Sequence, residues 1–380
     1  MGATLMSNKI FDAEDIAAVT RVLESGVLSA GPEAAALEEE FAAALGAGHA
    51  ISCNAAMAGL HAALWAVGVG AGDEVVCDPL VLFGGLAVLY TGAMPVFADV
   101  DEQTHNMDPT SLAERITPRT KAIIVTHHWG EPADMGGILA VAEAHKLPVV
   151  EDCAHVLFGK WQGRNAGTLG SVGVFSFQSS KHLSTGDGGI AVTNDPYLAE
   201  QVRAIVTFGA APTRLAHNFR MTEMTAAVAR VQLRRARGYV AEDRASAQLY
   251  AQAVEGCAWL RPQQASADSV HSYHLWVAAF VPQPGGPSLD EFKEACAAEE
   301  ANFSFGYVGV PAYLHPVFSL GGSFGVSRDP QAQPLPYRRG WCPVTESLMP
   351  RLMITGVSAR DGDFHRRNAD ALARAIRRFS

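Results

Sequence analysis

The segment 175–189 combines hydroxyl side chains, one amine and a glycine-rich turn. An apolar run ends at Ser176, two further serines follow, and Lys181 comes directly after them. A lysine attacks a carbonyl carbon only as the neutral amine, so a catalytic lysine needs surroundings that lower its pKa. The nearby hydroxyl groups and turn amides suit a phosphate. A lysine beside a turn is usually solvated, so this segment alone does not establish catalysis.

A second apolar run, 148–152, ends in the acidic residues Glu151 and Asp152. A carboxylate at a strand end can keep a pyridine nitrogen protonated, which turns the aromatic ring into an electron sink. The simpler interpretation is that Asp152 caps the following loop, and the segment alone favours it.

Two further segments could bind parts of the same ligand. Small residues open a predicted helix at Ala56 and Met57, where free backbone amides and the positive helix end suit an anion. Phe83 precedes two glycines, which let the backbone approach closely enough for the ring to lie flat on a ligand. A phenylalanine in the core is the ordinary alternative.

The elements that must position these residues follow from the hydrophobic pattern. Short apolar runs alternate with helical segments, and this rhythm predicts a mainly parallel sheet with helices on both faces. Ligand loops collect at the strand ends of such a sheet. The predicted strands lie at residues 49–53, 74–81, 94–99, 122–127, 148–152, 172–177 and 189–193.

The pattern changes after a long predicted helix at 221–254. Proline and glycine become more frequent from about residue 257, and the strand–helix rhythm ends. We therefore expect a large domain at 1–240 and a smaller α+β domain at 241–380. The segment 301–345 is irregular, and it is either a loop that covers the substrate or a long connection. The other predicted helices lie at 10–46, split at 29–32, and at 56–69, 111–116, 137–145, 289–300 and 362–379.

Composition excludes several classes of partner. The net charge is −10 and no basic run carries interleaved aromatic residues, so we expect neither nucleic acid nor membrane as a partner. No apolar stretch approaches the ~18 residues of a membrane-spanning helix. The six cysteines form no close pair, so we expect no metal site, reduced thiols and a cytoplasmic protein.

Together and in this order, the segments resemble the DegT/DnrJ/EryC1/StrS family, the sugar-type aminotransferases of fold type I among pyridoxal-phosphate enzymes. The resemblance extends from about residue 13 to the C-terminus. It implies an α/β fold with a large, mainly parallel-sheet domain and a smaller C-terminal α+β domain. The matching segments include residues 29–32, 71–75, 92–101, 116–124, 127–134, 151–155, 175–189 and 218–233.

The resemblance implies a role for each matching residue. Lys181 would hold pyridoxal 5′-phosphate as a Schiff base and move a proton between Cα and C4′. Asp152 would pair with the ring nitrogen, and Phe83 would stack on the ring. The remaining implied contacts are His155 near the ring, Ser176 with the amides of Ala56 and Met57 at the phosphate, Gln178 beside O3′, and Asn218, which would reach the phosphate of a neighbouring subunit. The last contact implies a homodimer with shared active sites.

The sequence departs from the family pattern at several positions. Ala56-Met57 stands where Gly-Thr or Ala-Thr is usual, and His182 replaces a common Asn. His128 and Trp129 replace a common Leu-Tyr pair, and they either line the substrate cleft or are structural. In the variable stretch 301–345, Tyr313 and His315 are candidates for substrate selectivity.

The resemblance implies a transamination. Glutamate or glutamine would supply an amino group to a keto-sugar, nucleotide-linked or free, or to a keto-cyclitol, in sugar or antibiotic biosynthesis. One alternative is a sugar dehydratase dependent on the same cofactor, but such relatives carry His at the lysine position. A second alternative is a non-catalytic, sensor-like family member.

Overall fold

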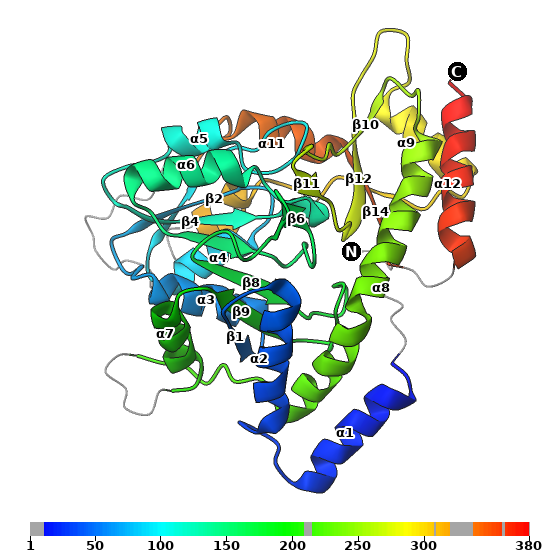
Figure 1. Cartoon of the computed structure of the whole chain (residues 1–380). Coiled ribbons are helices and arrows are strands. Elements are labelled where there is room, and N and C mark those ends of the chain that lie inside the picture. The colour runs from blue at the N-terminus through cyan, green and yellow to red at the C-terminus, as the bar shows by residue number, and fades with distance from the viewer. Residues whose placement is uncertain (1–10, 209–214, 308, 320–336, 359–361, 380) are drawn as a thin grey trace.

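The computed structural model describes residues 11–208, 215–307, 309–319, 337–358 and 362–379. Within these residues, Figure 1 shows a central sheet covered by helices, from which the long helix α8 (Glu223–Ala253) leads to a second, smaller group of strands and helices. The predicted α/β class is therefore confirmed, and the active-site segments all belong to the central sheet or its loops.

The central sheet has the order β1-β9-β8-β5-β4-β2-β3. Five neighbouring strands, from β8 to β3, run parallel, while β9 runs antiparallel to both of its neighbours. The carboxyl ends of the parallel strands therefore meet at one edge. The strands are β1 (His49–Cys53), β2 (Glu74–Cys77), β3 (Met94–Phe97), β4 (Thr120–Thr126), β5 (Val149–Asp152), β8 (Val172–Ser176) and β9 (Gly189–Thr193).

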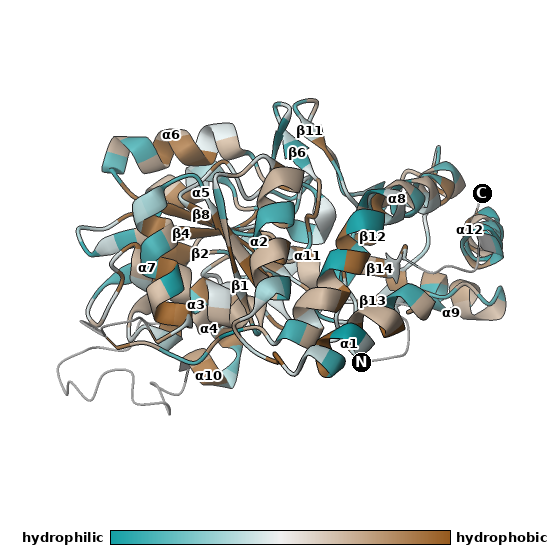
Figure 2. Cartoon of the chain, turned by 60° about the horizontal axis from the view of Figure 1, so that its bottom comes forward, coloured by the Kyte–Doolittle hydropathy of each residue, from teal (hydrophilic) through white to brown (hydrophobic). Residues whose placement is uncertain are grey.

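Both faces of this sheet are buried because successive side chains of a strand point to opposite sides. In β2, Val75 packs with α3 (Ala56–Ala66) and α4 (Phe83–Tyr90), while Val76 packs with α5 (Pro109–Glu114) and α6 (Met135–His145). The helix α7 (Pro196–Val206), which was not predicted, covers the first face with Val202 and Ile205. In Figure 2, α7 carries both hydrophobic and hydrophilic residues, as such a helix must.

The second face is completed at the β1 side by α2 (Pro32–Leu45) and the first half of α8, through residues such as Phe41 and Leu233. The helix α1 (Ala13–Ser25) packs on α8 through Ala18 and Val22. The prediction of two helices at 10–46 is confirmed.

The smaller domain is built on a four-stranded sheet of order β10-β12-β14-β13. Its strands are β10 (Leu260–Pro262), β12 (Leu275–Phe280), β14 (Leu352–Gly356) and β13 (Ser304–Phe305). One face packs on α9 (Leu289–Ala298), α12 (Gly362–Arg377) and the end of α8. The other face packs on Leu80 and Trp129 at the active-site edge of the central sheet. The two domains therefore share a hydrophobic contact next to the predicted site.

The predicted domain division at residue 240 stays a prediction, because α8 is continuous across it. The chain also returns to the central sheet: η3 (Ala312–Leu314), α10 (Pro316–Ser319) and α11 (Pro343–Leu348) follow β13, and Tyr313 and Phe318 belong to its core. The described part of 301–345 is thus mostly a packed connection, while residues 308 and 320–336 lie outside the described residues.

Two local features differ from the predicted elements. The strand predicted at 74–81 ends at Cys77, because Pro79 has no N–H to donate and the N–H of Leu80 instead binds Asp78 Oδ1 at 3.0 Å. A three-stranded sheet of order β11-β6-β7 was not predicted, since its strands are only two residues long. They are β6 (Lys160–Trp161), β7 (Arg164–Asn165) and β11 (Ser269–Val270).

One buried carboxylate joins two helices of the large domain. Glu223, the first residue of α8, accepts hydrogen bonds from the backbone N–H groups of Gly31, Glu33 and Ala34 at 2.7–3.2 Å. These amides form the start of α2, which has no side-chain cap of its own. Because free amides at a helix start attract negative charge, Glu223 fixes α2 to α8.

We expect Glu223→Gln to lower the free energy of unfolding by about 1–3 kcal/mol, because a neutral amide cannot accept three hydrogen bonds as well as a carboxylate does. Urea denaturation followed by circular dichroism measures this difference. Glu242→Gln, at an exposed position of the same helix, is the matched control and should change the free energy by less than about 0.5 kcal/mol. Equal effects of the two substitutions would contradict this role.

Candidate active site

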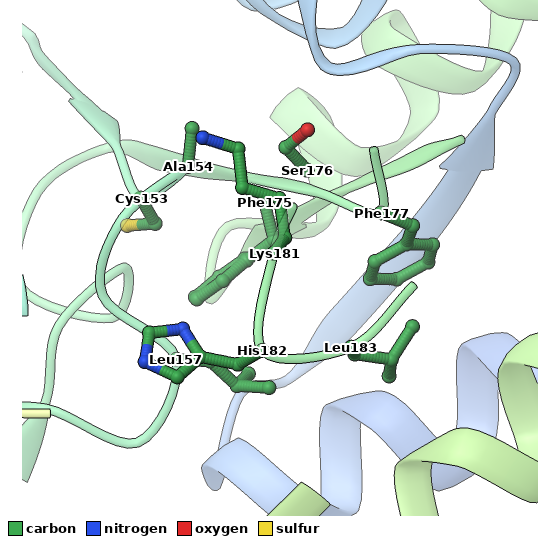
Figure 3. Close-up of a pocket in the computed structure, with 9 residues that line it drawn as sticks. All are labelled: Cys153, Ala154, Leu157, Phe175, Ser176, Phe177, Lys181, His182 and Leu183. Atoms are coloured by element: carbon green, nitrogen blue, oxygen red, sulfur yellow. The ribbon is translucent and has the colours of Figure 1, made fainter. Parts of the chain in front are cut away.

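Lys181 lies in the loop between β8 and β9, in a small pocket with Ala154 and Ser176. Figure 3 shows its amine on the same side as the Ser176 hydroxyl, while His182 points the other way. Burial among protein groups lowers the pKa of Lys181 to about 8, and the negative charge of Asp152 opposes this shift. A neutral amine is therefore accessible near physiological pH, as a lysine nucleophile requires.

Asp152 is the last residue of β5, and only 2% of its surface is exposed. Its Oδ1 accepts a hydrogen bond from the N–H of Ala154 at 3.0 Å. Burial raises the pKa of Asp152 above its ordinary value, while the N–H of Ala154 and the charge of Lys181 act in the opposite direction. The Lys181 amine, from the loop after β8, thus interacts with the Asp152 carboxylate at the end of the neighbouring strand β5.

A stack of aromatic rings lies beside these two charges. The His155 ring stacks on Trp129, with centroids 5.8 Å apart, and on His274, with centroids 4.6 Å apart. Burial lowers the pKa of His155 well below its ordinary value, so the ring is neutral. Its Nδ1 is buried and has no hydrogen-bond partner among the described residues. Buried polar atoms are normally paired, so this atom points to a polar group of a ligand.

The predicted phosphate site is assembled where α3 meets β8 and β9. The helix start at Ala56 has no side-chain cap, and Ser176 pairs with Gly189 in the sheet. A Cβ atom at Gly189 would lie 2.6 Å from the N atom of Ala56, so glycine lets the helix start approach the strand. Ser176 Oγ accepts from the N–H of Gln178 at 3.3 Å. The uncapped amides of Ala56 and Met57, together with this hydroxyl, suit an anion.

Three other predicted cofactor residues are exposed. Phe83 is the first residue of α4, and 48% of its surface is exposed. The Gln178 side chain bonds with the hydroxyl groups of Ser179 and Ser180. Asn218 lies in an extended segment that bridges to Thr207, and the next residue, Phe219, accepts from the N–H of Asn54. The structure therefore places Asn218 near the start of α3, with its side chain facing outward.

The candidate substrate residues lie in the interior. Tyr313 is fully buried, and its hydroxyl donates to Glu346 and accepts from the N–H of Cys342 at 3.2 Å. His315 is partly buried and follows directly on η3. Tyr313 thus occupies a core position without a free polar atom, because the chain returns here to the central sheet.

His128 and Trp129 are also fully buried. His128 Nε2 lies 2.8 Å from Asp78 Oδ1, and Trp129 packs edge-on against Tyr307 with ring centroids 4.6 Å apart. Trp129 adopts a left-handed backbone with φ 63°, which is unfavourable for a bulky residue. The pair therefore lies at the contact between the domains, where Trp129 is itself part of the ring stack.

Sequence reasoning missed two residues that lie close to the site, Asp78 and His274. Asp78 follows β2 as Asp152 ends β5, so its position after an apolar run was an available signal. His274 comes from the smaller domain, and only the packing of that domain brings it here. In addition, His182 Nε2 faces the carbonyl oxygen of Ser272 at 3.2 Å and Asp243 Oδ2 at 3.8 Å.

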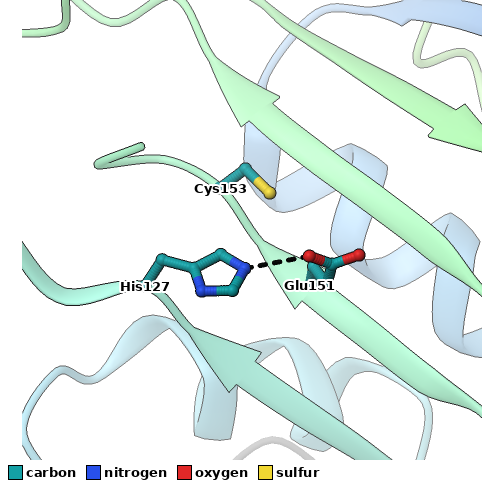
Figure 4. A group of neighbouring side chains, drawn as sticks. All are labelled: His127, Glu151 and Cys153. Atoms are coloured by element: carbon teal, nitrogen blue, oxygen red, sulfur yellow. Dashed lines mark hydrogen bonds and ion pairs between the residues drawn. The ribbon is translucent and has the colours of Figure 1, made fainter. Parts of the chain in front are cut away.

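Within the described part of the chain, one group of side chains has ligand atoms close enough for a metal ion. His127, Glu151 and Cys153 place such atoms within 4.8 Å of one another (Figure 4). Burial, however, raises the pKa of the Cys153 thiol well above its ordinary value, and only a thiolate binds metals strongly. His127 and Glu151 already form a hydrogen bond of 3.0 Å. The arrangement is that of a buried hydrogen-bonded pair.

No described helix combines the length and the apolar character that a membrane span requires.

The chain matches the profile of the DegT/DnrJ/EryC1/StrS aminotransferase family over residues 9–353. It is 37% identical over 323 residues to the spore coat polysaccharide biosynthesis protein SpsC of Bacillus subtilis (strain 168), covering 80% of this chain and 82% of that protein. The structure of DesV from S. venezuelae superposes with a TM-score of 0.85 at 31% identity, covering 97% of this chain and 95% of DesV. The structure of DesI with its TDP-sugar product has a TM-score of 0.84 at 28% identity, covering 99% and 93%.

The arrangement of Lys181, Asp152 and the anion site at one sheet edge agrees with these similarities. The chain therefore belongs to the DegT/DnrJ/EryC1/StrS aminotransferase family, and its fold is that of the fold type I pyridoxal-phosphate aminotransferases.

Proposed function

We propose that this protein transfers an amino group to a keto-sugar, with pyridoxal 5′-phosphate bound at Lys181 and Asp152. The observation that supports this proposal most directly is the electrostatic interaction between the Lys181 amine, from the loop after β8, and the buried Asp152 carboxylate at the end of the neighbouring parallel strand β5. When bound, the cofactor supplies an electron sink for the carbon that carries the amino group. The residues of the chain must hold the cofactor, keep its ring nitrogen protonated and move one proton.

Lys181 is the residue proposed to move that proton. With a pKa of about 8, roughly one-tenth of the amine is neutral at pH 7. An ordinary lysine would be almost completely protonated and could not act as a base. The pocket therefore keeps the pKa of the Lys181 amine close to the pH at which it would act as a general base.

Asp152 is proposed to face the ring nitrogen. Its burial means that no water screens its charge, so a cationic nitrogen next to it would be strongly stabilised. The neutral His155 beside it, with an unpaired Nδ1, is proposed to bind a polar group of the cofactor. Phe83 and Gln178 remain proposed contacts of the ring and of its O3′ side.

The phosphate is proposed to lie at Ser176 and the amides of Ala56 and Met57, with Asn218 of a second copy completing the site. The exposed position of Asn218 supports a contact between subunits. Large apolar side chains are also exposed nearby, including Phe208 at 49% and Tyr90 at 55%. Exposed apolar surface of this kind is typical of an interface, so we propose a homodimer with shared sites.

The acceptor is proposed to be a keto-sugar, because SpsC is named for polysaccharide biosynthesis and DesI was solved with a TDP-sugar product. A nucleotide-linked sugar is therefore the first acceptor to test, before a free keto-sugar or a keto-cyclitol. The proposed donor is glutamate or glutamine. All six cysteines are free thiols, which agrees with a cytoplasmic enzyme.

A dehydratase reaction is less well supported. His182 would have to take the place of Lys181, but its ring faces Ser272 and Asp243, away from the lysine amine. Against a sensor that only binds the cofactor stands the pair of Lys181 and Asp152, which together provide a group that can move a proton and a carboxylate for the ring nitrogen.

We expect Lys181→Ala to lower kcat/KM by at least about a hundredfold, because the variant loses both the covalent anchor and the proton-transfer group. Circular dichroism should show an unchanged fold. Wild-type protein with pyridoxal phosphate, reduced with borohydride and digested, should yield a labelled peptide containing Lys181. A label on any other lysine, or full turnover by the variant, would refute the assignment.

We expect the rate at which the apoprotein captures pyridoxal phosphate at Lys181 to rise with pH and to reach half its maximum near pH 8. The sign follows from the chemistry, since only the neutral amine attacks and its fraction grows as pH passes the pKa. Stopped-flow absorbance between pH 6 and 10 measures the midpoint. A midpoint near 10.5, the ordinary value for lysine, would contradict the buried environment.

Mixing two inactive variants tests the shared site. If Asn218 serves the partner's phosphate, a dimer of one Lys181→Ala and one Asn218→Ala subunit contains one intact site. Random mixing makes half of the dimers mixed, so activity should return to about a quarter of the wild-type value. The separate variants and their unmixed sum are the controls. No recovery in the mixed dimers would show that Asn218 acts within its own chain or not at all.

A further inference from the structure

Two consecutive histidines after β4 pair with different carboxylates. His127 Nε2 lies 3.0 Å from Glu151, and its Nδ1 accepts from the N–H of Ala133 at 3.0 Å. Glu151 in turn accepts from three backbone amides, those of Gly167, Leu169 and Gly170. All polar atoms of this pair are therefore used within the fold, as expected for a structural contact.

His128 differs from its neighbour in one respect. Its Nε2 lies 2.8 Å from Asp78 Oδ1, and the side chains are only 0% and 1% exposed. Its Nδ1, however, is buried without a hydrogen-bond partner among the described residues. The backbone N–H of His128 is held by Asn106 Oδ1 at 2.8 Å, so the ring cannot easily move away from Asp78. In the part of the chain that the structure describes, the fold therefore leaves His128 Nδ1 and Asp78 Oδ2 without hydrogen-bond partners. In such dry surroundings the pair acts strongly on neighbouring charges.

The strand order places this pair next to Asp152. The strands β5, β4 and β2 are neighbours, and Asp152, His128 and Asp78 lie at or just beyond their carboxyl ends. His128 thus follows β4, the strand that lies between β5, which carries Asp152, and β2, which precedes Asp78. Burial is the main cause of the raised pKa of Asp152, but Asp78 adds to that shift and His128 reduces it. Although burial alone would raise the pKa of Asp78, the His128 ring holds it below its ordinary value.

We propose that the Asp78–His128 pair is a positioning device for Asp152: the imidazole Nε2 binds the Asp78 carboxylate, so that, of these two carboxylates, Asp152 is the one left to face the cofactor. His128 is then a positioning residue and touches neither substrate nor cofactor. This inference rests on the proposed function, since it assumes that Asp152 faces the cofactor ring.

Other titratable groups face the same region and must stay unchanged in a test. Lys181 comes from the loop after β8, His155 from the loop after β5 and Tyr307 from the segment after β13, and each interacts electrostatically with Asp152, Asp78 or His128. His105, from the loop after β3, interacts with His128, and the thiols of Cys77 and Cys342 interact with Asp78.

The test uses the full chain reconstituted with pyridoxal phosphate, and it measures the pH midpoint of the visible absorption band above pH 7. In this pH range Asp78 stays ionised in a His128 variant even if the pKa of Asp78 rises by about two units. His128→Leu leaves that carboxylate uncompensated near the cofactor. We expect the midpoint to rise by about one pH unit, a tenfold change in the proton equilibrium, because added negative charge stabilises the protonated form.

The double variant His128→Leu/Asp78→Asn removes both members of the pair, and its midpoint should return to within a few tenths of a unit of wild type. His127→Leu is the matched control: it removes a histidine of equal burial, so it should lower thermal stability without moving the midpoint. An unchanged midpoint in His128→Leu, or a double variant displaced as far as the single one, would refute the proposal. If wild type forms no coloured adduct at Lys181, the proposed function itself has failed.

Discussion

The electrostatic interaction between Lys181 and Asp152 is the constraint on which the site depends. Asp152 is buried and Lys181 is half-buried, and desolvation shifts the pKa of each towards its neutral form. Their mutual attraction opposes this shift, so each group favours the charged form of the other. Without the other group, the pKa of Lys181 would be lower still and that of Asp152 higher still. The fold must therefore bring the amine and the carboxylate to the same edge of the central sheet.

The central sheet delivers them by placing the ends of parallel strands side by side. Asp152 ends β5 and Ser176 ends β8, and the helix start at Ala56 approaches them because Gly189 has no side chain to displace it. The smaller domain then closes the edge with His274 and the face of β12. At this contact Gly130 has φ 107°, and a Cβ there would lie 2.5 Å from the N atom of Tyr273. Backbone proximity between the domains therefore requires glycine.

The strained Trp129 belongs to the same contact. Its left-handed backbone turns the chain directly after His128, and its ring contributes to the hydrophobic cluster between the domains. Its carbonyl oxygen accepts from the N–H of His274 at 2.7 Å. One short segment thus carries a structural histidine, a histidine facing Asp78 and the tryptophan that joins the domains. Because neighbouring residues of this segment have such different contacts, residue type alone does not show whether residues 127–130 bind the substrate.

The sequence by itself determined the strands of the central sheet, most of the helices and the two charged groups that follow apolar runs, because these follow from local hydrophobic periodicity and from the position of a polar residue after an apolar run. It also contained the motifs of the family, which the match over residues 9–353 confirms. The partners of buried side chains were not accessible in this way. Tyr313 was a candidate for the substrate, yet the chain returns to the central sheet and buries it.

Asp78 and His128 stand 50 residues apart, and they meet only because β4 lies next to β2 while β3 takes the outer edge. That strand order is decided by the packing of helices on both faces of the sheet. Local chemistry therefore determined which residues could react, and tertiary packing alone decided which charges would face one another without water between them.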